Sequence, residues 1–164
     1  MGEYDVAQVC MDGHVVNDNY RRHPEHNRPF CPKCGQKTIV ACPSCSSPIP
    51  GDFHVPGVAV LSTSSPTVDP YCGSCGAPYP WTASGLEAAR ELIDLFEELD
   101  EEERDSLKGT LDDLVRESPR TEVAVVKFKR IMKRVGAEGA SAMKSILIDL
   151  MTDAARRGVW GPPT

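Results

Sequence analysis

Seven cysteines and one histidine form four short pairs in the first half of this 164-residue chain. The pairs are Cys10-x3-His14, Cys31-x2-Cys34, Cys42-x2-Cys45 and Cys72-x2-Cys75. One tight turn can present both residues of a pair to a single ion, and zinc takes four such ligands in structural sites. Gly35 and Gly76 directly follow two of the pairs, and glycine tolerates the positive φ of such a turn. The eight side chains therefore predict two Zn2+ ions per chain, with no cysteine left over.

The order of the pairs indicates how they combine. Sequential pairing places the first two pairs on one zinc and the last two on the other, with intervening loops of 16 and 26 residues. A nested arrangement joins the second and third pairs, which only seven residues separate. A cross-braced arrangement usually has a histidine in its middle pairs, whereas this chain has its histidine in the first. We favour sequential pairing, and the nested order stays open.

His14 is the ligand that has competitors. His23 and His26 lie in the following loop, and either could take the fourth place at the first site. We prefer His14 because it stands where a turn that begins at Cys10 would end. Disulfides are the competing use of the cysteines, but seven is an odd number and residues 1–10 lack the apolar segment of an export signal. We expect metal-bound cysteines in a cytoplasmic protein.

The chain changes character near Trp81, because every cysteine and histidine precedes this residue and helical periodicity follows it. We expect a double zinc-ribbon domain over residues 1–82 and a helical domain over residues 83–164, which together make an α+β protein. The short strands expected in the first domain are residues 4–9, 15–17, 37–40 and 53–61, followed by a loop over 62–70. The aromatic residues Tyr71, Tyr79 and Trp81 are expected in its small apolar core or at its contact with the helical domain. The alternative is that they stack on nucleic-acid bases.

Apolar residues at helical spacing predict four helices in the second domain. The expected starts are the capping-box patterns Ser84 with Glu87 and Asp100 with Glu103, then Pro119, then about Ala140. The expected ends of the third and fourth helices are Gly136 and, after Arg157, Gly158. Short connections between helices predict antiparallel neighbours in a small bundle.

Charge is segregated within the second domain. Residues 84–118 hold 13 acidic and four basic side chains, a net charge of −9, whereas residues 119–164 hold four acidic and nine basic ones, a net charge of +5. We expect the acidic helices to pair with the basic ones inside one bundle. The alternative is a basic face for nucleic acid or anionic lipid, made by Lys127, Lys129, Arg130, Lys133 and Arg134.

Short sequence motifs accompany the cysteine pairs over residues 1–82. They are the run from Tyr4 to Cys10, Gly13-His14-Val15, Cys31-x2-Cys34-Gly35, Cys42-Pro43-x-Cys45, His54-Val55-Pro56-Gly57-Val58, and Cys72-x2-Cys75-Gly76-x-Pro78-Tyr79-Pro80-Trp81-Thr82. With these motifs, residues 1–82 resemble an uncharacterised bacterial family of double zinc-ribbon proteins, catalogued as a domain of unknown function. The resemblance implies the ribbon fold and the metal. Residues 83–164 resemble the helical tails attached to such ribbons.

Two classes of function are compatible with these features. A catalytic zinc keeps one position open for water, but four ligands close each predicted site, so we expect no enzyme. The first class is an adaptor that binds another protein through the ribbon or the helical tail. The alternative is a nucleic-acid-binding regulator, which the net charge of −6 disfavours. No apolar run is long enough to span a membrane.

Overall fold

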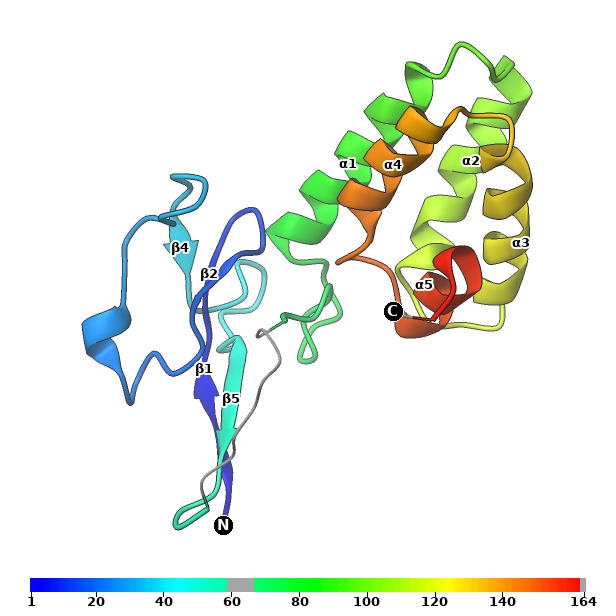
Figure 1. Ribbon diagram of the computed structural model, residues 1–164. Helices are drawn as coiled ribbons and strands as arrows, with labels where there is room; N and C mark the ends of the chain where they lie inside the picture. Colours follow the sequence, from blue (N-terminus) through cyan, green and yellow to red (C-terminus); the bar gives the residue numbers. More distant parts are fainter. Residues whose placement is uncertain (59–66, 163–164) are drawn as a thin grey trace. The chain divides into compact units, whose positions relative to one another are not determined.

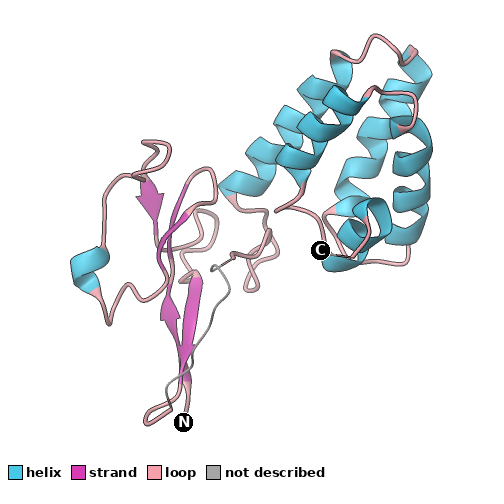
Figure 2. Ribbon diagram, viewed as in Figure 1, coloured by secondary structure: helices cyan, strands magenta, loops and turns pink. Residues whose placement is uncertain are grey.

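The computed structural model describes residues 1–58 and 67–162 (Figure 1). Strands occur in the N-terminal part of the chain and helices dominate the rest (Figure 2). The backbone divides into two compact units, Met1–Ala83 and Ser84–Thr164. Small antiparallel sheets and a set of helices in separate segments confirm the expected α+β class.

Short strands form two small antiparallel sheets in the described part of the first unit. Strand β1 (Glu3–Val6) pairs with β5 (Pro50–His54). Strand β2 (Gln8–Cys10) lies between β3 (Val15–Asn17) and β4 (Thr38–Ile39). A 3-10 turn, η1 (Pro24–His26), lies in the loop between β3 and β4.

Two of the predicted strands are wrong in their extent. The strand expected over residues 4–9 is divided at Ala7, whose amide donates to the carbonyl oxygen of Ile49 at 2.9 Å. The division arises because β1 and β2 pair with different partners and so belong to different sheets. The strand expected over 53–61 begins earlier, and β5 ends at His54. Residues 59–61, and residues 62–66 of the expected loop, lie outside the described residues.

Aromatic residues after the last cysteine pair form part of the first unit's core. The rings of Tyr79 and Trp81 stack with their centroids 4.5 Å apart, and both side chains are buried. The indole nitrogen of Trp81 donates to the carbonyl oxygen of Asp69 at 3.2 Å. The predicted aromatic core is confirmed for these two residues, whereas Tyr71 is only half-buried.

Five helices follow in the described part of the chain: α1 (Pro80–Asp94), α2 (Glu101–Leu114), α3 (Thr121–Met132), α4 (Ala137–Leu147) and α5 (Asp153–Trp160). The predicted capping box at α2 is confirmed, because the carboxylate of Asp100 accepts from the amide of Glu103 and the Glu103 carboxylate accepts from the amide of Asp100. Helix α3 packs against α2 and α5. Its Phe128 is buried, and so are Leu107 and Leu111 of α2 and Leu147 of α4.

The single helix expected from Ala140 to Arg157 is instead two helices, so the expectation of four helices is wrong. Between α4 and α5 the chain turns, and the amides of Leu150 and Met151 both donate to the carbonyl oxygen of Leu147. This turn buries Leu150 and Met151 together. Thr152 then begins a new helix, since its hydroxyl accepts from the amide of Ala155 at 3.2 Å.

Other helix boundaries also differ from expectation. Helix α3 ends at Met132 rather than at Gly136, and α4 begins at Ala137 rather than near Ala140. Helix α1 begins at Pro80 rather than Ser84, since proline suits a first helical turn. Helix α3 begins at Thr121, two residues after Pro119. Gly158 lies inside α5 instead of ending it, and Gly161, with φ 85°, caps the helix after Trp160. A Cβ at Gly158 would lie 2.8 Å from Val125 of α3, so this glycine serves close helix packing.

The expected pairing of acidic with basic helices holds only in part. Two of the described ion pairs join the acidic segment to the basic one, Arg120 to Asp113 and Arg134 to Glu103. Two others link the acidic helices α1 and α2 to each other, Arg90 to Asp112 and Lys108 to Asp94. The other four cations of the predicted basic face make no ion pair with any described residue: Lys127, Lys129, Arg130 and Lys133. None of the described helices combines the length and the apolar character that a membrane crossing requires.

Candidate metal centres

The three Cys-x2-Cys pairs fold into the same turn. In each, the amide four residues after the first cysteine donates to the carbonyl oxygen of that cysteine at 2.8 Å, and the donors are Gly35, Ser46 and Gly76. The amide of the first cysteine donates to the carbonyl oxygen five residues later, at 2.8–2.9 Å. An antiparallel bridge closes each turn: Phe30 with Lys37, Ala41 with Pro48, and Tyr71 with Pro78. The structure therefore contains one eight-residue turn three times.

This turn requires a left-handed residue after its second cysteine. Gly35 has φ 75° and Gly76 has φ 72°, and a serine, Ser46, stands at the same place with φ 62°. Within the described segments, no other residue besides glycine has a positive φ. Since a side chain in this region clashes with the backbone, the second turn is strained where the other two are relaxed.

The first ligand group combines Cys10 and His14 with Cys31 and Cys34. Strand β2 ends at Cys10, whose Sγ lies 3.5 Å from Nδ1 of His14 and 3.7 Å from Sγ of Cys34. The Sγ of Cys31 lies 3.7 Å from the same Nδ1. Between Cys10 and His14 the chain reverses at Gly13, which has φ 86°. All four ligand atoms lie within 4.8 Å of one another.

The second ligand group combines Cys42, Cys45, Cys72 and Cys75. The Sγ atoms of Cys42 and Cys75 are 3.8 Å apart, and those of Cys45 and Cys72 are 3.7 Å apart. All seven cysteines are free thiols. The structure thus brings the pairs together in sequential order, and each group has the donor set of a site that could hold a metal ion.

Backbone amides and neighbouring thiols shift the pKa values of the second group. The amides of Cys75 and Ser74 point at the thiol of Cys72 and lower its pKa to about 6. The amide of Ala77 lowers the pKa of Cys75, but the thiols of Cys45 and Cys72, together with burial, outweigh it and raise that pKa to about 12. Four thiolates at this spacing repel one another, so full ionisation of the group requires a cation.

The first group has the same division. Burial raises the pKa of Cys31, but the amides of Lys33 and Cys34 and the neighbouring thiols outweigh burial and bring this pKa to about 7. The pKa of Cys34 is raised to about 12: the amide of Gln36 lowers it, whereas burial and the thiols of Cys31 and Cys10 prevail. In both groups the first cysteine of the last pair is the readily ionised thiol, and it is buried, whereas the second cysteine of that pair is exposed.

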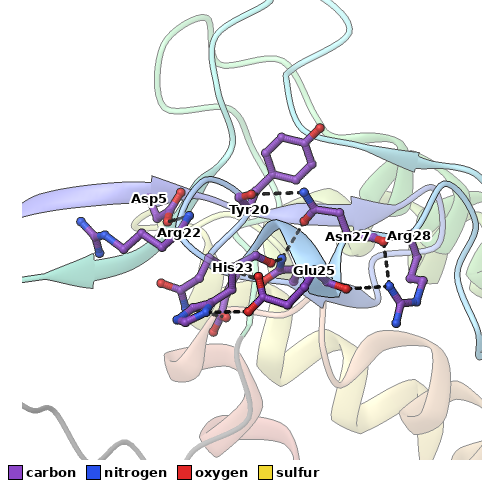
Figure 3. A network of polar contacts seen from close by, with 10 residues as sticks. Asp5, Tyr20, Arg22, His23, Glu25, Asn27 and Arg28 are labelled. Carbon is purple, nitrogen blue, oxygen red and sulfur yellow. Dashed lines mark hydrogen bonds and ion pairs between the residues drawn. The ribbon is translucent and has the colours of Figure 1, made fainter.

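A buried carboxylate holds the loop that leads to the second cysteine pair. Asp5 of β1 accepts hydrogen bonds from the amides of Val6 at 2.6 Å, Arg21 at 3.0 Å and Arg22 at 3.2 Å. Burial raises the pKa of Asp5, but these amides together outweigh burial and lower it. Figure 3 shows Asp5 beside Arg22 and, in the same loop, the amide of Asn27 bonded to the carbonyl oxygen of Tyr20 at 3.2 Å.

Two further buried polar side chains complete this support. The amide group of Gln8 binds both backbone groups of Arg28, accepting from its nitrogen at 3.0 Å and donating to its oxygen at 2.7 Å. Asn17 donates to the carbonyl oxygen of His23 at 2.8 Å. Polar side chains from the strands therefore position the loop at residues 20–28, and this loop places Cys31 beside β2.

The alternative histidine ligands lie away from both groups. His23 stacks on His26, and its Nδ1 contacts the carboxylate of Glu25 at 3.0 Å (Figure 3). Both rings are exposed. His54 lies in β5 and is half-buried. Among the histidines, the structure places only His14 within a ligand group.

The family described as "Uncharacterized protein conserved in bacteria (DUF2321)" matches residues 3–159, and the chain belongs to this family. The match includes both ligand groups and nearly all of the helical unit. No curated protein and no solved structure matches.

Proposed function

We propose that each ligand group holds a structural zinc ion and that the protein is a non-enzymatic adaptor, which binds another protein. The observation that carries the zinc assignment is the spacing of the ligand atoms. A tetrahedral zinc with Zn–S bonds of about 2.3 Å has S···S edges of about 3.8 Å and S···N edges of about 3.6 Å. The corresponding contacts are 3.7–3.8 Å between sulfurs and 3.5–3.7 Å between sulfur and Nδ1.

The ligand count supports a structural role for both ions. Structural zinc is four-coordinate with protein side chains, whereas catalytic zinc keeps a position for water or substrate. Cys10, His14, Cys31 and Cys34 already fill four places, and so do the four cysteines of the second group. A bound zinc ion supplies the positive charge that stabilises the thiolates and ties distant segments of the chain together.

An exposed aromatic pair on the β1–β5 sheet supports the adaptor role. The rings of Tyr4 and Phe53 pack with their centroids 4.8 Å apart, yet the two residues remain 63% and 45% exposed. Phe30, beside the second cysteine pair, is also exposed. Aromatic side chains held in solvent contribute little to folding, and tyrosine and phenylalanine are enriched at protein interfaces. The pair is therefore our candidate for the partner-binding surface.

The test is affinity capture from a bacterial lysate, with and without nuclease. We expect a protein partner that the Tyr4→Ala/Phe53→Ala variant loses and the control variant Phe30→Ala keeps, with metal content unchanged in both. Capture that nuclease abolishes would contradict the adaptor. It would favour the second candidate, nucleic-acid binding, which the unpaired cations of α3 support. Capture that both variants retain would place the binding surface elsewhere.

A further inference from the structure

One side of helix α3 is free of packing. The helix lies against α2 and α5 with Ala124, Phe128 and Ile131 buried. The opposite side is exposed and carries the residues that we call the basic face: Val123, Val126, Lys127, Lys129, Arg130 and Lys133. Its four cations form no ion pair with any part of the chain that the structure describes. Like charges three or four residues apart on a helix repel one another, so an anionic partner would reduce this repulsion.

The centre of the basic face is apolar. At 100° per residue, Val123, Val126 and Arg130 fall within about 60° of one another, with the lysines on either side. The two valines are 53% and 66% exposed. Phosphate groups of nucleic acid need cations and gain nothing from valine, whereas a protein surface can match both features. The expected partner surface therefore combines carboxylates with an apolar side chain.

The same unit carries a surface of that composition. The connection between α1 and α2 and the first turn of α2 expose the residues that we call the acidic edge: Leu95, Glu97, Glu98, Glu101 and Glu102. Leu95 is 73% exposed. The four carboxylates have no ion pair among the described residues. The acidic edge thus complements the basic face in charge and in its apolar contact.

The two surfaces adjoin at one end of the helical unit. Helices α2 and α3 pack together and are joined by a short connection, so they run antiparallel. The ion pair between Arg134 and Glu103 joins the end of α3 to the beginning of α2. Although the surfaces are neighbours, the cations of the basic face do not reach the acidic edge of their own copy.

We propose that two copies of the chain associate through this end of the helical unit, with the basic face of each copy on the acidic edge of the other. Because the surfaces adjoin, a two-fold arrangement forms the same contact twice and closes the assembly as a dimer. At physiological salt, charges act over about 8 Å, so these local contacts outweigh the repulsion of two chains with net charge −6. Exposed ion pairs are individually weak, and we expect a dissociation constant on the order of 100 µM.

The test is sedimentation velocity of the nuclease-treated, zinc-loaded full chain from about 10 µM to about 1 mM, at salt of about 0.1 M and 1 M. We expect a dimer at low salt and a monomer at high salt. Lys127→Glu/Arg130→Glu should weaken the dimer by on the order of tenfold or more, as should Glu98→Lys/Glu102→Lys. The control, Lys144→Glu/Arg157→Glu, makes the same charge change at exposed residues of α4 and α5 outside the two surfaces and should leave the dimer intact.

Mixing the two charge-reversed variants, one of the basic face and one of the acidic edge, gives the most decisive result. In an equimolar mixture, the reversed face of one variant meets the reversed edge of the other, and the unchanged face and edge also meet. We therefore expect a heterodimer tighter than either variant alone, with unchanged helical circular dichroism in both. A wild-type monomer at the highest concentration and low salt would overturn the proposal. Charge-reversed variants that dimerise as well as the wild type would also overturn it, and so would an equimolar mixture that stays monomeric. The Tyr4→Ala/Phe53→Ala variant should dimerise normally, so a failure of the adaptor proposal can be told apart from a failure of the dimer proposal.

Discussion

The repeated turn predicts opposite effects for two alanine substitutions three residues apart. Gly73 and Gly76 lie in the third turn, and a Cβ added at either would meet no atom within 4 Å. Only Gly76 has a positive φ, 72°. The two positions therefore differ in backbone conformation and not in available space, so each is the matched control for the other.

The size of each effect follows from two opposing contributions. Alanine in the left-handed region costs about 1–2 kcal/mol. Replacing glycine also reduces the freedom of the unfolded chain, which stabilises the fold by about 0.4–1 kcal/mol. Gly76→Ala should therefore destabilise the zinc-bound unit by about 1 kcal/mol, whereas Gly73→Ala should stabilise it by about 0.5 kcal/mol. Ser46→Gly reverses the first case and should stabilise by about 1 kcal/mol.

Competition with a chromophoric chelator measures these differences, because zinc binding and folding are coupled in small metal domains. A change of 1.4 kcal/mol is tenfold in affinity, so Gly76→Ala should weaken apparent zinc affinity about fivefold and Ser46→Gly should strengthen it about fivefold. Gly73→Ala should strengthen it about twofold. If both glycine substitutions change the affinity in the same direction, the argument from φ is refuted.

Three further predictions concern the first unit. His14→Ala should reduce zinc at the first group, whereas a His23→Ala/His26→Ala double variant should keep two zinc ions by metal analysis; equal losses would mean that the loop shares the coordination. Removing zinc with excess chelator should unfold residues 1–83 and leave amide-exchange protection in 84–164, because the helices bury their own apolar core; loss of that protection would contradict independent folding. Asp5→Asn removes the charge that three amides bind and should cost about 2 kcal/mol in urea unfolding at pH 7. A cost near zero would show that the loop does not depend on this carboxylate.

Local features of the sequence were sufficient for much of the architecture. The spacing of the cysteine pairs is a property of single turns, and so is the capping box at Asp100 and Glu103. The burial of Tyr79 and Trp81 follows from the scarcity of other large apolar residues beside the last pair. The α+β class follows from the change of pattern near Trp81.

Features that depend on contacts between residues far apart in the chain could not be predicted from the sequence. Ala7 divides a strand because β1 pairs with residues more than forty positions later while β2 pairs elsewhere. Asp5 stands in an alternating segment where a polar residue normally faces solvent, and only the fold shows that it binds the loop at 20–28. Gly158 reads as a helix stop, yet close contact with Val125 keeps it within α5.

Ser46 shows what a repeat can reveal. In the sequence, a glycine directly follows the Cys31/Cys34 pair and the Cys72/Cys75 pair. Aligning the Cys42/Cys45 pair with these two places Ser46 where they have glycine, and so identifies it as a left-handed position. The equal spacing of the cysteines in the three turns carries this information, although the residue at this position is serine and not glycine.

The most direct test of the account is the metal stoichiometry of the reduced, natively folded chain, by native mass spectrometry together with X-ray absorption at the zinc edge. We expect two zinc ions per chain, with seven sulfur ligands and one nitrogen ligand in total, so that the average shell of each zinc has about 3.5 sulfurs and about 0.5 nitrogen. One equivalent or fewer, or disulfides among the seven cysteines, would contradict the paired structural sites on which the account rests.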